Sequence, residues 1–412
     1  MNTRLETTLR TPSSEARGRP LADTVLELIW VQKQMSRAEI ARRTGLSRST
    51  VSEIVSGLLK TGLIAEIGDG PSRGGRRPIV LEFQDDAFVI LGVDMGATHV
   101  SVALTDLRGK VLAWEHSDHP VRHDPEGTGA LIEELCDNCL RQWGGTRKHL
   151  LGIGVAVPSP VDPKNPDDLS TIALPAWRGR SGLEGLKAEY DAPVFVDNDA
   201  NLGALAERWW GAGRGIDDFA YIKVATGIGA GYMIRGEIYR GSTGVAGEIG
   251  HVTIDQEGPV CVCGNRGCLA TFVGAEAIVA QARSLRGDFP DSPLAEGDIS
   301  LAAIEDAALN GDPLALQVVH RAARRLGVAI ADVLNLMNPG SVILGGALSR
   351  LGDRLVIPLR ETVVRRTFVN SVAAADILTS ALGPRAIAVG AATLVLDSAL
   401  QNPRLFPDPA PA

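Results

Sequence analysis

Hydrophobic and polar positions in the first 83 residues follow a helical spacing and then a strand-like one. Between positions 21 and 31 the apolar residues fall on one face of a helix. Ser36 and Glu39 have the spacing of a capping box, so a second, short helix is expected after Ser36. A third helix is expected after Gly45, followed by two short strands at 63–68 and 78–83.

The second and third predicted helices have the layout of a helix-turn-helix. Ser47 can cap the third helix, and Val51, Val55 and Leu58 belong to its inner stripe. The outward side of that helix begins with short hydrogen-bonding side chains and one arginine, at Ser47, Arg48, Ser49, Thr50 and Ser52. These residue types at the start of a recognition helix suit base edges and phosphates, so we expect them to contact DNA.

The loop between the two predicted strands is rich in glycine and arginine. Arg73, Arg76 and Arg77 lie on it and form a basic tip that can enter a minor groove or grip phosphates. A helical hairpin with a solvated basic loop, used for dimerisation, is the alternative. Both cationic features fall where a winged helix-turn-helix needs them, so we predict such a DNA-binding domain at 20–83, after a flexible tail at 1–19.

The rest of the chain shows one strand pattern twice. Residues 88–117 have the pattern of three strands joined by tight turns, and residues 219–241 repeat it about 130 positions later. This duplication predicts two similar lobes facing a cleft, each with a sheet and helices, and hence an α/β body. We place the lobes at 84–200 and 201–412, with the C-terminal helix returning to the first lobe.

Charge and composition limit the classes of protein that fit. Residues 1–80 carry 13 Lys and Arg against 8 Asp and Glu, although the whole chain has a net charge of −8, so only the head suits a polyanion. No apolar run approaches the ~18–20 residues of a membrane span, and the N-terminus lacks the apolar stretch of a signal peptide. Five cysteines, three of them near one His, favour a reducing compartment, so a cytoplasmic protein without a membrane partner is expected.

Glycine-rich turns after the duplicated strands are candidates for binding phosphates. Asp94 can reach a phosphate-bound Mg²⁺, while Gly96 and Thr98 let backbone and hydroxyl groups approach a phosphate. In the second lobe, the corresponding candidates are Thr226, Gly227 and Gly229, and the pair Gly345 and Gly346 after a later strand permits close approach of a flat ligand such as adenine. Ordinary hairpin turns and close helix packing are the alternative explanations.

Four carboxylate or amide side chains fall within residues 197–201, where an apolar strand ends and a helix begins near Asn201. Asn198 and Asp199 can hydrogen-bond a polyhydroxylated ligand, and a carboxylate there can take a proton from a sugar hydroxyl that attacks a phosphate. A helix N-cap is the alternative, although one cap needs only one such residue.

These motifs together resemble the ROK family, which joins sugar-responsive transcriptional repressors and sugar kinases. The resemblance covers nearly the whole chain and depends on the winged helix and on DMGAT, VPSPVD, DNDAN, ATGIGAG and YRGSTGVAGEIGH, with ILGGALS near the C-terminus. GEIGH followed by CVCGNRGC is the most specific of these motifs. The resemblance implies a two-lobed, actin-like sugar-kinase body behind the DNA-binding head.

The resemblance also implies roles for single residues. His251, Cys261, Cys263 and Cys268 match the ligands of a structural Zn²⁺, a Cys₃His set that suits a tetrahedral ion. Glu248 and His251 match residues that touch the sugar, with Asn198 and Asp199, and Asp199 matches the catalytic base. Cys136 and Cys139 form a CxxC on a helical pattern, without further ligands nearby, and we interpret them as helix core and surface.

Two departures from the family pattern weaken the kinase interpretation. Ala270 stands where the family has a sugar-binding Glu, and Ala173 and Leu174 stand before Trp177 where the family often has Asn-Leu. We therefore predict a sugar-responsive DNA-binding regulator, a repressor of carbohydrate genes. Its expected partners are an operator duplex, a sugar effector and further copies of the same chain, as a homodimer or a dimer of dimers. A kinase that uses ATP and Mg²⁺ and also binds DNA is the alternative, and a body that only dimerises is a third.

Overall fold

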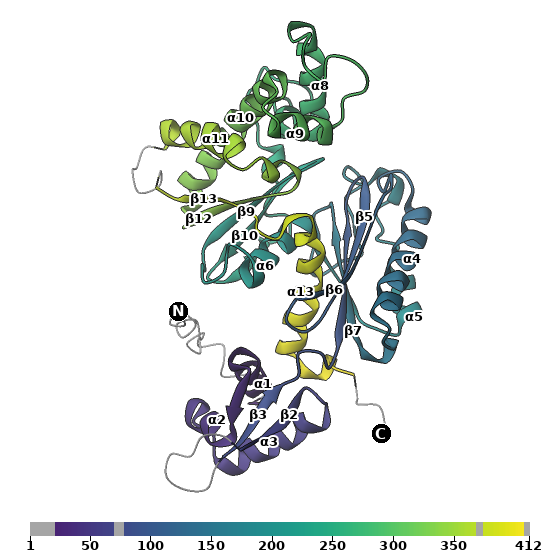
Figure 1. The fold of residues 1–412 in the computed structure, drawn as a ribbon, viewed down its shortest axis with the longest axis vertical. Helices are drawn as coiled ribbons and strands as arrows, with labels where there is room; N and C mark the ends of the chain where they lie inside the picture. The colour runs from purple at the N-terminus through teal and green to yellow at the C-terminus, as the bar shows by residue number, and fades with distance from the viewer. Residues whose placement is uncertain (1–20, 70–77, 368–373, 408–412) are drawn as a thin grey trace.

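The computed structural model describes residues 21–69, 78–367 and 374–407 (Figure 1). The predicted tail at 1–19 and the wing residues Arg73, Arg76 and Arg77 lie outside these ranges. Within them, no helix combines the length and the apolar composition that crossing a membrane requires.

The head is a helix-turn-helix with a small antiparallel sheet in the order β1-β3-β2. Its elements are α1 (Leu21–Gln32), β1 (Gln34–Ser36), α2 (Arg37–Thr44), α3 (Arg48–Lys60), β2 (Ile64–Asp69) and β3 (Ile79–Phe83). The expected capping is confirmed: the backbone N–H of Glu39 donates to Ser36 Oγ over 3.2 Å, and that of Thr50 donates to Ser47 Oγ over 3.1 Å. Gly45 ends α2 in the left-handed region, at φ 71°.

The body contains two five-stranded sheets with the same topology, as the duplicated pattern predicts. The first has the order β6-β5-β4-β7-β8 and the second has the order β11-β10-β9-β12-β13. In each, the first three strands in sequence are antiparallel and the last two continue parallel to the first. The strands are β4 (Val89–Met95), β5 (His99–Thr105), β6 (Val111–Asp118), β7 (Leu150–Val157), β8 (Val194–Asn198), β9 (Phe219–Val224), β10 (Ile228–Ile234), β11 (Glu237–Tyr239), β12 (Ser341–Gly345) and β13 (Asp376–Thr379).

Two helices, α6 (Asp199–Trp210) and α13 (Ala386–Gln401), pack against each other between the sheets (Figure 1). α13 lies on β4 and β7, so the C-terminal helix returns to the first lobe, and α6 lies on β9 and β10. Glycines permit this close packing. A Cβ on Gly92 would lie 1.9 Å from the carbonyl oxygen of Ala388, and a Cβ on Gly390 would lie 1.9 Å from that of Leu202.

The other helices cover the outer faces of the two sheets. In the first lobe these are α4 (Pro125–Trp143) and α5 (Glu184–Tyr190); in the second they are α7 (Ala270–Val273), α8 (Ala275–Leu285), α9 (Leu301–Leu309), α10 (Pro313–Met337) and α11 (Asp353–Arg366). Each lobe has its own hydrophobic core on that side.

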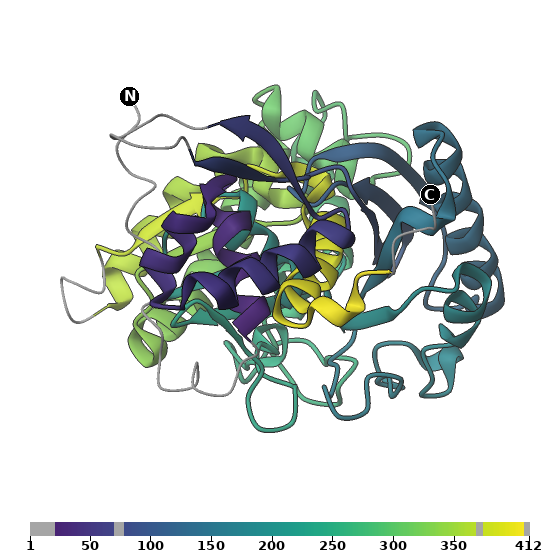
Figure 2. The same cartoon turned by 90° about the horizontal axis from the view of Figure 1, so that it is seen from below.

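The head packs directly on the body, beside the ends of α6 and α13 (Figures 1 and 2). Trp30 of α1 has its ring centroid 5.2 Å from that of Trp209 and 6.4 Å from that of Trp210, at the end of α6. Its indole N–H donates to the carbonyl of Leu107 over 3.0 Å, and the Arg108 guanidinium lies 4.5 Å from its ring. Trp30 therefore contacts both a turn of the first lobe and the helix between the lobes.

Candidate functional site

Buried charges meet where the two lobes adjoin. Asp94 and Lys223 are the next-to-last residues of β4 and β9, and Asp199 is the first residue of α6. All three are at most 9% exposed. Lys223 Nζ lies 2.5 Å from Asp199 Oδ2. Burial opposes protonation of Lys223, but the charges of Asp199 and Asp94 outweigh it and raise the lysine pKa.

Asp94 is held by a histidine on the next strand. His99 Nε2 lies 3.2 Å from Asp94 Oδ2, and its ring covers Gly96 so closely that a Cβ there would lie 2.3 Å from the imidazole. Burial opposes ionisation, yet the hydrogen bond from His99 and the charges of His99 and Lys223 lower the pKa of Asp94. Oδ1 of Asp94 is buried and has no partner among the described residues.

The residues at 197–201 are partly used to build the helix start. Helix α6 begins at Asp199, two residues before the predicted start near Asn201, and Asn198 is its N-cap. Asn198 Oδ1 accepts from the backbone of Ala200, and its amide donates to the carbonyl of Ser159 over 3.1 Å. The capping alternative is thus realised at Asn198, while Asp199 points its carboxylate at Lys223.

Asp197 forms an ion pair that joins the two lobes. Arg240, which follows β11, donates from Nε and Nη2 to Asp197 Oδ2 over 3.0 and 2.5 Å. Asp197 Oδ1 accepts from the Asn201 amide over 3.0 Å, so both carboxylate oxygens are engaged. Asp197 is therefore a structural residue at this junction.

The residues predicted to bind a nucleotide or its phosphates divide into exposed and packed positions. Thr98 and Gly227 are exposed, and a Cβ on Gly227 would meet nothing within 4 Å. A Cβ on Gly345 would lie 2.0 Å from the Tyr221 hydroxyl, which supports the packing alternative for that glycine. Thr226 is half-buried, Gly229 faces Ala200 and Gly346 has φ +82°, and no contact described here assigns a ligand to them.

Glu248 and His251 lie next to each other beside η4 (Ile249–His251). Glu248 Oε2 is 3.9 Å from His251 Nε2, and the side chain of Glu248 is 42% exposed. Partial desolvation and the charge of Asp199 raise the pKa of Glu248. Because the charge of Asp199 acts on the pKa of Glu248, the loop that carries Glu248 lies near the buried charges at the lobe junction.

His251, Cys261, Cys263 and Cys268 form the one group of potential metal ligands in the described part of the chain, with all ligand atoms within 4.8 Å of one another. A tetrahedral ion with Zn–S bonds of about 2.3 Å would hold two sulfur atoms about 3.8 Å apart. Cys263 Sγ and Cys268 Sγ are 3.7 Å apart, and Cys261 Sγ is 3.5 Å from His251 Nδ1. The four residues therefore fit a tetrahedral metal ion.

The cysteines at 261–268 and those on α4 differ in acidity. A backbone N–H at Asn265 lowers the pKa of Cys263 to about 7, while burial raises that of Cys268 to about 12. Cys136 and Cys139 on α4 are both fully buried, and burial raises the pKa of Cys139 to about 12. The structural interpretation of this pair fits its burial, but neither residue lies on the surface as the sequence suggested.

Ala270 opens the short helix α7 and is half-buried. Its methyl group cannot accept a hydrogen bond from a sugar. Trp177 is buried, and its indole N–H donates to the carbonyl of Val121 over 2.7 Å. Trp177, which follows the departure from the family pattern at Ala173, is thus part of the first-lobe core.

The predicted DNA-contacting residues lie at the start of α3. Ser47, Arg48, Ser49 and Ser52 are exposed and Thr50 is half-buried. Arg42 and Arg43 on α2 are paired with Glu39, whereas Arg48 has no hydrogen bond or ion pair with any described residue. Arg48 is thus available for a phosphate or a base.

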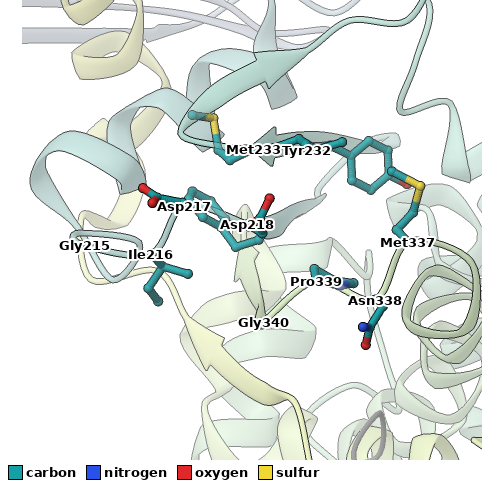
Figure 3. Close-up of a pocket in the computed structure, with 12 residues that line it drawn as sticks. Gly215, Ile216, Asp217, Asp218, Tyr232, Met233, Met337, Asn338, Pro339 and Gly340 are labelled. Atoms are coloured by element: carbon teal, nitrogen blue, oxygen red, sulfur yellow. The ribbon is translucent and has the colours of Figure 1, made fainter. Parts of the chain in front are cut away.

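A pocket of about 460 Å³ lies elsewhere, at the amino ends of β9 and β12 (Figure 3). Asp217 there is paired with Arg208, and Asp218 accepts from the backbone of Arg235. Ligands of open α/β sheets bind outside the carboxyl ends of the strands, where Asp94 and Lys223 lie. The buried charges are therefore the better candidate site.

Three residues at the site were not found by sequence reasoning: His99, Lys223 and Arg240. Each lies within or beside a recognised motif, and a charged residue inside the apolar run FAYIKV was the available signal for Lys223. Their partners could not be inferred, because Lys223 is 24 residues from Asp199 and Arg240 is 43 from Asp197.

Sequence models of two families match the chain: that of the ROK family at residues 90–398 and that of the IclR helix-turn-helix domain at residues 24–67. The xylose repressor of Caldicellulosiruptor bescii is 31% identical over 383 residues, covering 92% of this chain and 96% of the repressor. A crystal structure of a ROK family transcriptional regulator, a homologue of the Escherichia coli MLC protein, has a TM-score of 0.78 at 26% identity, covering 93% of this chain and 96% of that one. A ROK family glucokinase from Streptomyces griseus, bound to glucose and AMPPNP, has a TM-score of 0.67 at 29% identity, covering 74% and 98%.

Proposed function

The chain belongs to the ROK family, and we propose that it is a sugar-responsive, DNA-binding transcriptional regulator, acting as a repressor of carbohydrate genes. The head carries the DNA contacts through Ser47, Arg48, Ser49, Thr50 and Ser52 and through the wing arginines. A recognition helix of this size reads few base pairs, so a homodimer or a dimer of dimers on a symmetric operator in the cytoplasm is part of the proposal.

The observation that carries this proposal is the course of α6. Its first residue is Asp199, at the buried charges, and its last two are Trp209 and Trp210, against Trp30 of the head. One rigid helix thus extends from the proposed sugar site to the DNA-binding domain. A ligand that binds one arrangement of the lobes better than another would shift both ends of this helix.

The proposed sugar site consists of Asn198, Asp199, Glu248 and His251. Carboxylate oxygens of Asp199 and Glu248 accept hydrogen bonds from hydroxyl groups, as a neutral polyol requires. The similarity to a xylose repressor makes D-xylose the first sugar to test. If ATP and Mg²⁺ are used, the exposed residues Thr98 and Gly227 are proposed phosphate contacts, with Asp94, Gly96, Thr226 and Gly229. Gly346 is proposed to approach the nucleotide base, while the contact of Gly345 with Tyr221 favours a packing role for that glycine.

The proposed metal is a structural Zn²⁺ held by His251, Cys261, Cys263 and Cys268. Bound there, it would supply four bonds that close a loop containing Gly258, Gly264 and Gly267. Because Glu248 lies beside His251, the same bonds would fix the proposed sugar-reading residues before the ligand arrives.

DNA binding is tested with duplexes selected from a random library on the full-length protein. Arg48→Ala is expected to weaken binding about tenfold or more and to change sequence preference. Arg76→Ala with Arg77→Ala is expected to weaken all duplexes and to reduce the salt dependence. Arg365→Ala, an exposed arginine of α11 far from the head, is the matched control for the loss of one charge. Unchanged binding in the head variants would show that another surface binds DNA.

The sugar response is tested by adding D-xylose, D-glucose or N-acetyl-D-glucosamine to the selected duplex complex. At least one sugar should change the affinity for DNA by about tenfold, which is within the range usual for coupling between two ligand sites. Asp199→Asn should reduce that response while leaving sugar-free DNA binding unchanged. A coupled assay for ADP release, with the same sugars and MgATP, tests the kinase alternative, and robust turnover lost in Asp199→Asn would favour it.

A further inference from the structure

Among the described residues, Lys223 is the only buried lysine. Its ammonium group donates to Asp199 Oδ2, and the two side chains are 11% and 8% exposed. A long, flexible side chain is rarely buried unless its charge is paired, because desolvation of the ammonium is unfavourable. The position of Lys223 is therefore tied to the carboxylate of Asp199.

The two strands that flank Lys223 place only glycine opposite it. Lys223 is directly opposite Gly229 on β10 and Gly345 on β12. Directly opposite residues in a sheet project to the same face, so these strand partners contribute no side chain of their own beside the lysine. The Tyr221 hydroxyl lies over Gly345 and the Ala200 methyl group lies over Gly229. Tyr221, two residues earlier on β9, packs on Gly203 of α6 and shows that this face is the one toward the helix.

The pairing leaves one oxygen of Asp199 available. Lys223 engages Oδ2, while no described residue donates a hydrogen bond to Oδ1. Oδ1 is also absent from the fully buried, unpartnered oxygens, unlike Oδ1 of Asp94. A hydroxyl group of a ligand can therefore donate to Oδ1 without breaking the ion pair.

We propose, on the basis of the proposed function, that Lys223 is a positioning residue that holds Asp199 as a fixed hydrogen-bond acceptor for one hydroxyl of an uncharged sugar. The ligand is bound and is not phosphorylated. Transfer of its proton to Asp199 would neutralise the carboxylate that is hydrogen-bonded to the buried ammonium of Lys223, which is unfavourable. The other buried carboxylate, that of Asp94, has a hydrogen-bond partner of its own in His99.

The test compares wild type, Lys223→Gln, Asp199→Asn and the double variant by calorimetric titration. The ligands are D-xylose, D-glucose and N-acetyl-D-glucosamine, each with its monodeoxy derivatives. In wild type, removal of one particular hydroxyl should weaken the best sugar about tenfold or more. In Lys223→Gln, the parent sugar should bind about tenfold more weakly, and the penalty for that same deoxygenation should fall below about twofold.

Thermal unfolding separates this role from a role in folding alone. Each single variant leaves one buried charge unpaired, so both should unfold at lower temperature, and the double variant should regain most of the loss. The double variant should nevertheless bind sugar as weakly as the singles. Wild-type affinity and an unchanged deoxygenation pattern in Lys223→Gln or in the double variant would overturn the proposal, as would sugar phosphorylation by wild type.

The proposed regulatory function fails on a different result. If a sugar binds and depends on Lys223 but leaves the DNA affinity of wild type unchanged, the role of Lys223 stands and sugar regulation does not. If the sugar changes DNA affinity equally in wild type and Lys223→Gln, regulation stands and the role of Lys223 is wrong.

Discussion

The first strands of the two lobes, β4 and β9, have the same place in the same topology but opposite charges at their ends. Asp94 is the next-to-last residue of β4, and Lys223 is the next-to-last residue of β9. Two residues earlier, β4 has Gly92 under α13, whereas β9 has Tyr221 against α6. The two sheets thus share one topology but present different side chains to the central helices α13 and α6.

The difference shows how a repeated fold acquires a single polar site. An apolar pattern and short turns are sufficient to form the sheet twice. The charge at the strand end is not needed for that pattern, so it can differ between the copies. Here the negative end lies close enough to the positive one to affect its pKa, and each has its own partner, His99 or Asp199.

The largest difference expected between the lobes concerns their cysteines. Cys263→Ser should remove about one Zn²⁺ per chain and lower the free energy of unfolding by about 4 kcal/mol or more, since loss of a structural metal is among the most destabilising changes. Metal analysis by mass spectrometry and thermal unfolding measure the two effects. Cys139→Ala in the first lobe is the control and should leave the metal content unchanged. Equal metal content in Cys263→Ser would contradict the assignment.

Helix packing gives the next largest effect. Gly92→Ala should lower the free energy of unfolding by about 3 kcal/mol or more, because the new Cβ would lie 1.9 Å from a backbone oxygen of α13 that cannot rotate away. Denaturant titration measures this change. Gly227→Ala, in the turn after β9, adds a Cβ to open space and should change stability little. Similar stability of the two variants would mean that α13 packs less closely on β4 than described.

Buried carboxyl groups give the smallest effect, with opposite pH signs. Burial raises the pKa of Glu207 on α6, against the hydrogen bonds from Ser380 and the backbone of Ala212. The folded protein thus keeps this proton to a higher pH than the unfolded chain, and the stabilisation it gives is lost as pH rises through the raised pKa. Glu207→Gln should therefore gain stability relative to wild type as pH rises from 5 to 8, by a few degrees in Tm.

Asp94 should show the reverse trend. Its pKa is lowered despite burial, so its contribution is present above the ordinary carboxyl range and is lost as pH falls through the folded-state pKa. Asp94→Asn should therefore be less stable than wild type near neutral pH, with the difference shrinking in acid. Thermal unfolding across the same pH series measures both variants, and parallel curves would contradict the opposite signs.

The sequence by itself determined the elements that depend on short-range spacing. Ser36 and Ser47 cap the helices they precede, because a cap and the N–H group it accepts from are three residues apart. The duplicated strand pattern predicted two sheets of one topology, since strand periodicity and turn glycines are local signals. Three cysteines and His251 fall within 18 residues, so the group of potential metal ligands was also visible in the sequence.

Only the tertiary structure decided which distant residues meet. No sequence pattern indicates that Lys223 contacts Asp199, that Arg240 contacts Asp197, or that Trp30 contacts Trp209. Each pair joins elements whose relative placement depends on how α6 packs between the sheets. The same packing gave Gly345 a contact with Tyr221 that the turn sequence alone could not distinguish from a ligand-binding role. Local periodicity specifies an element and its buried face, but the partner of that face is selected by the packing of the whole chain.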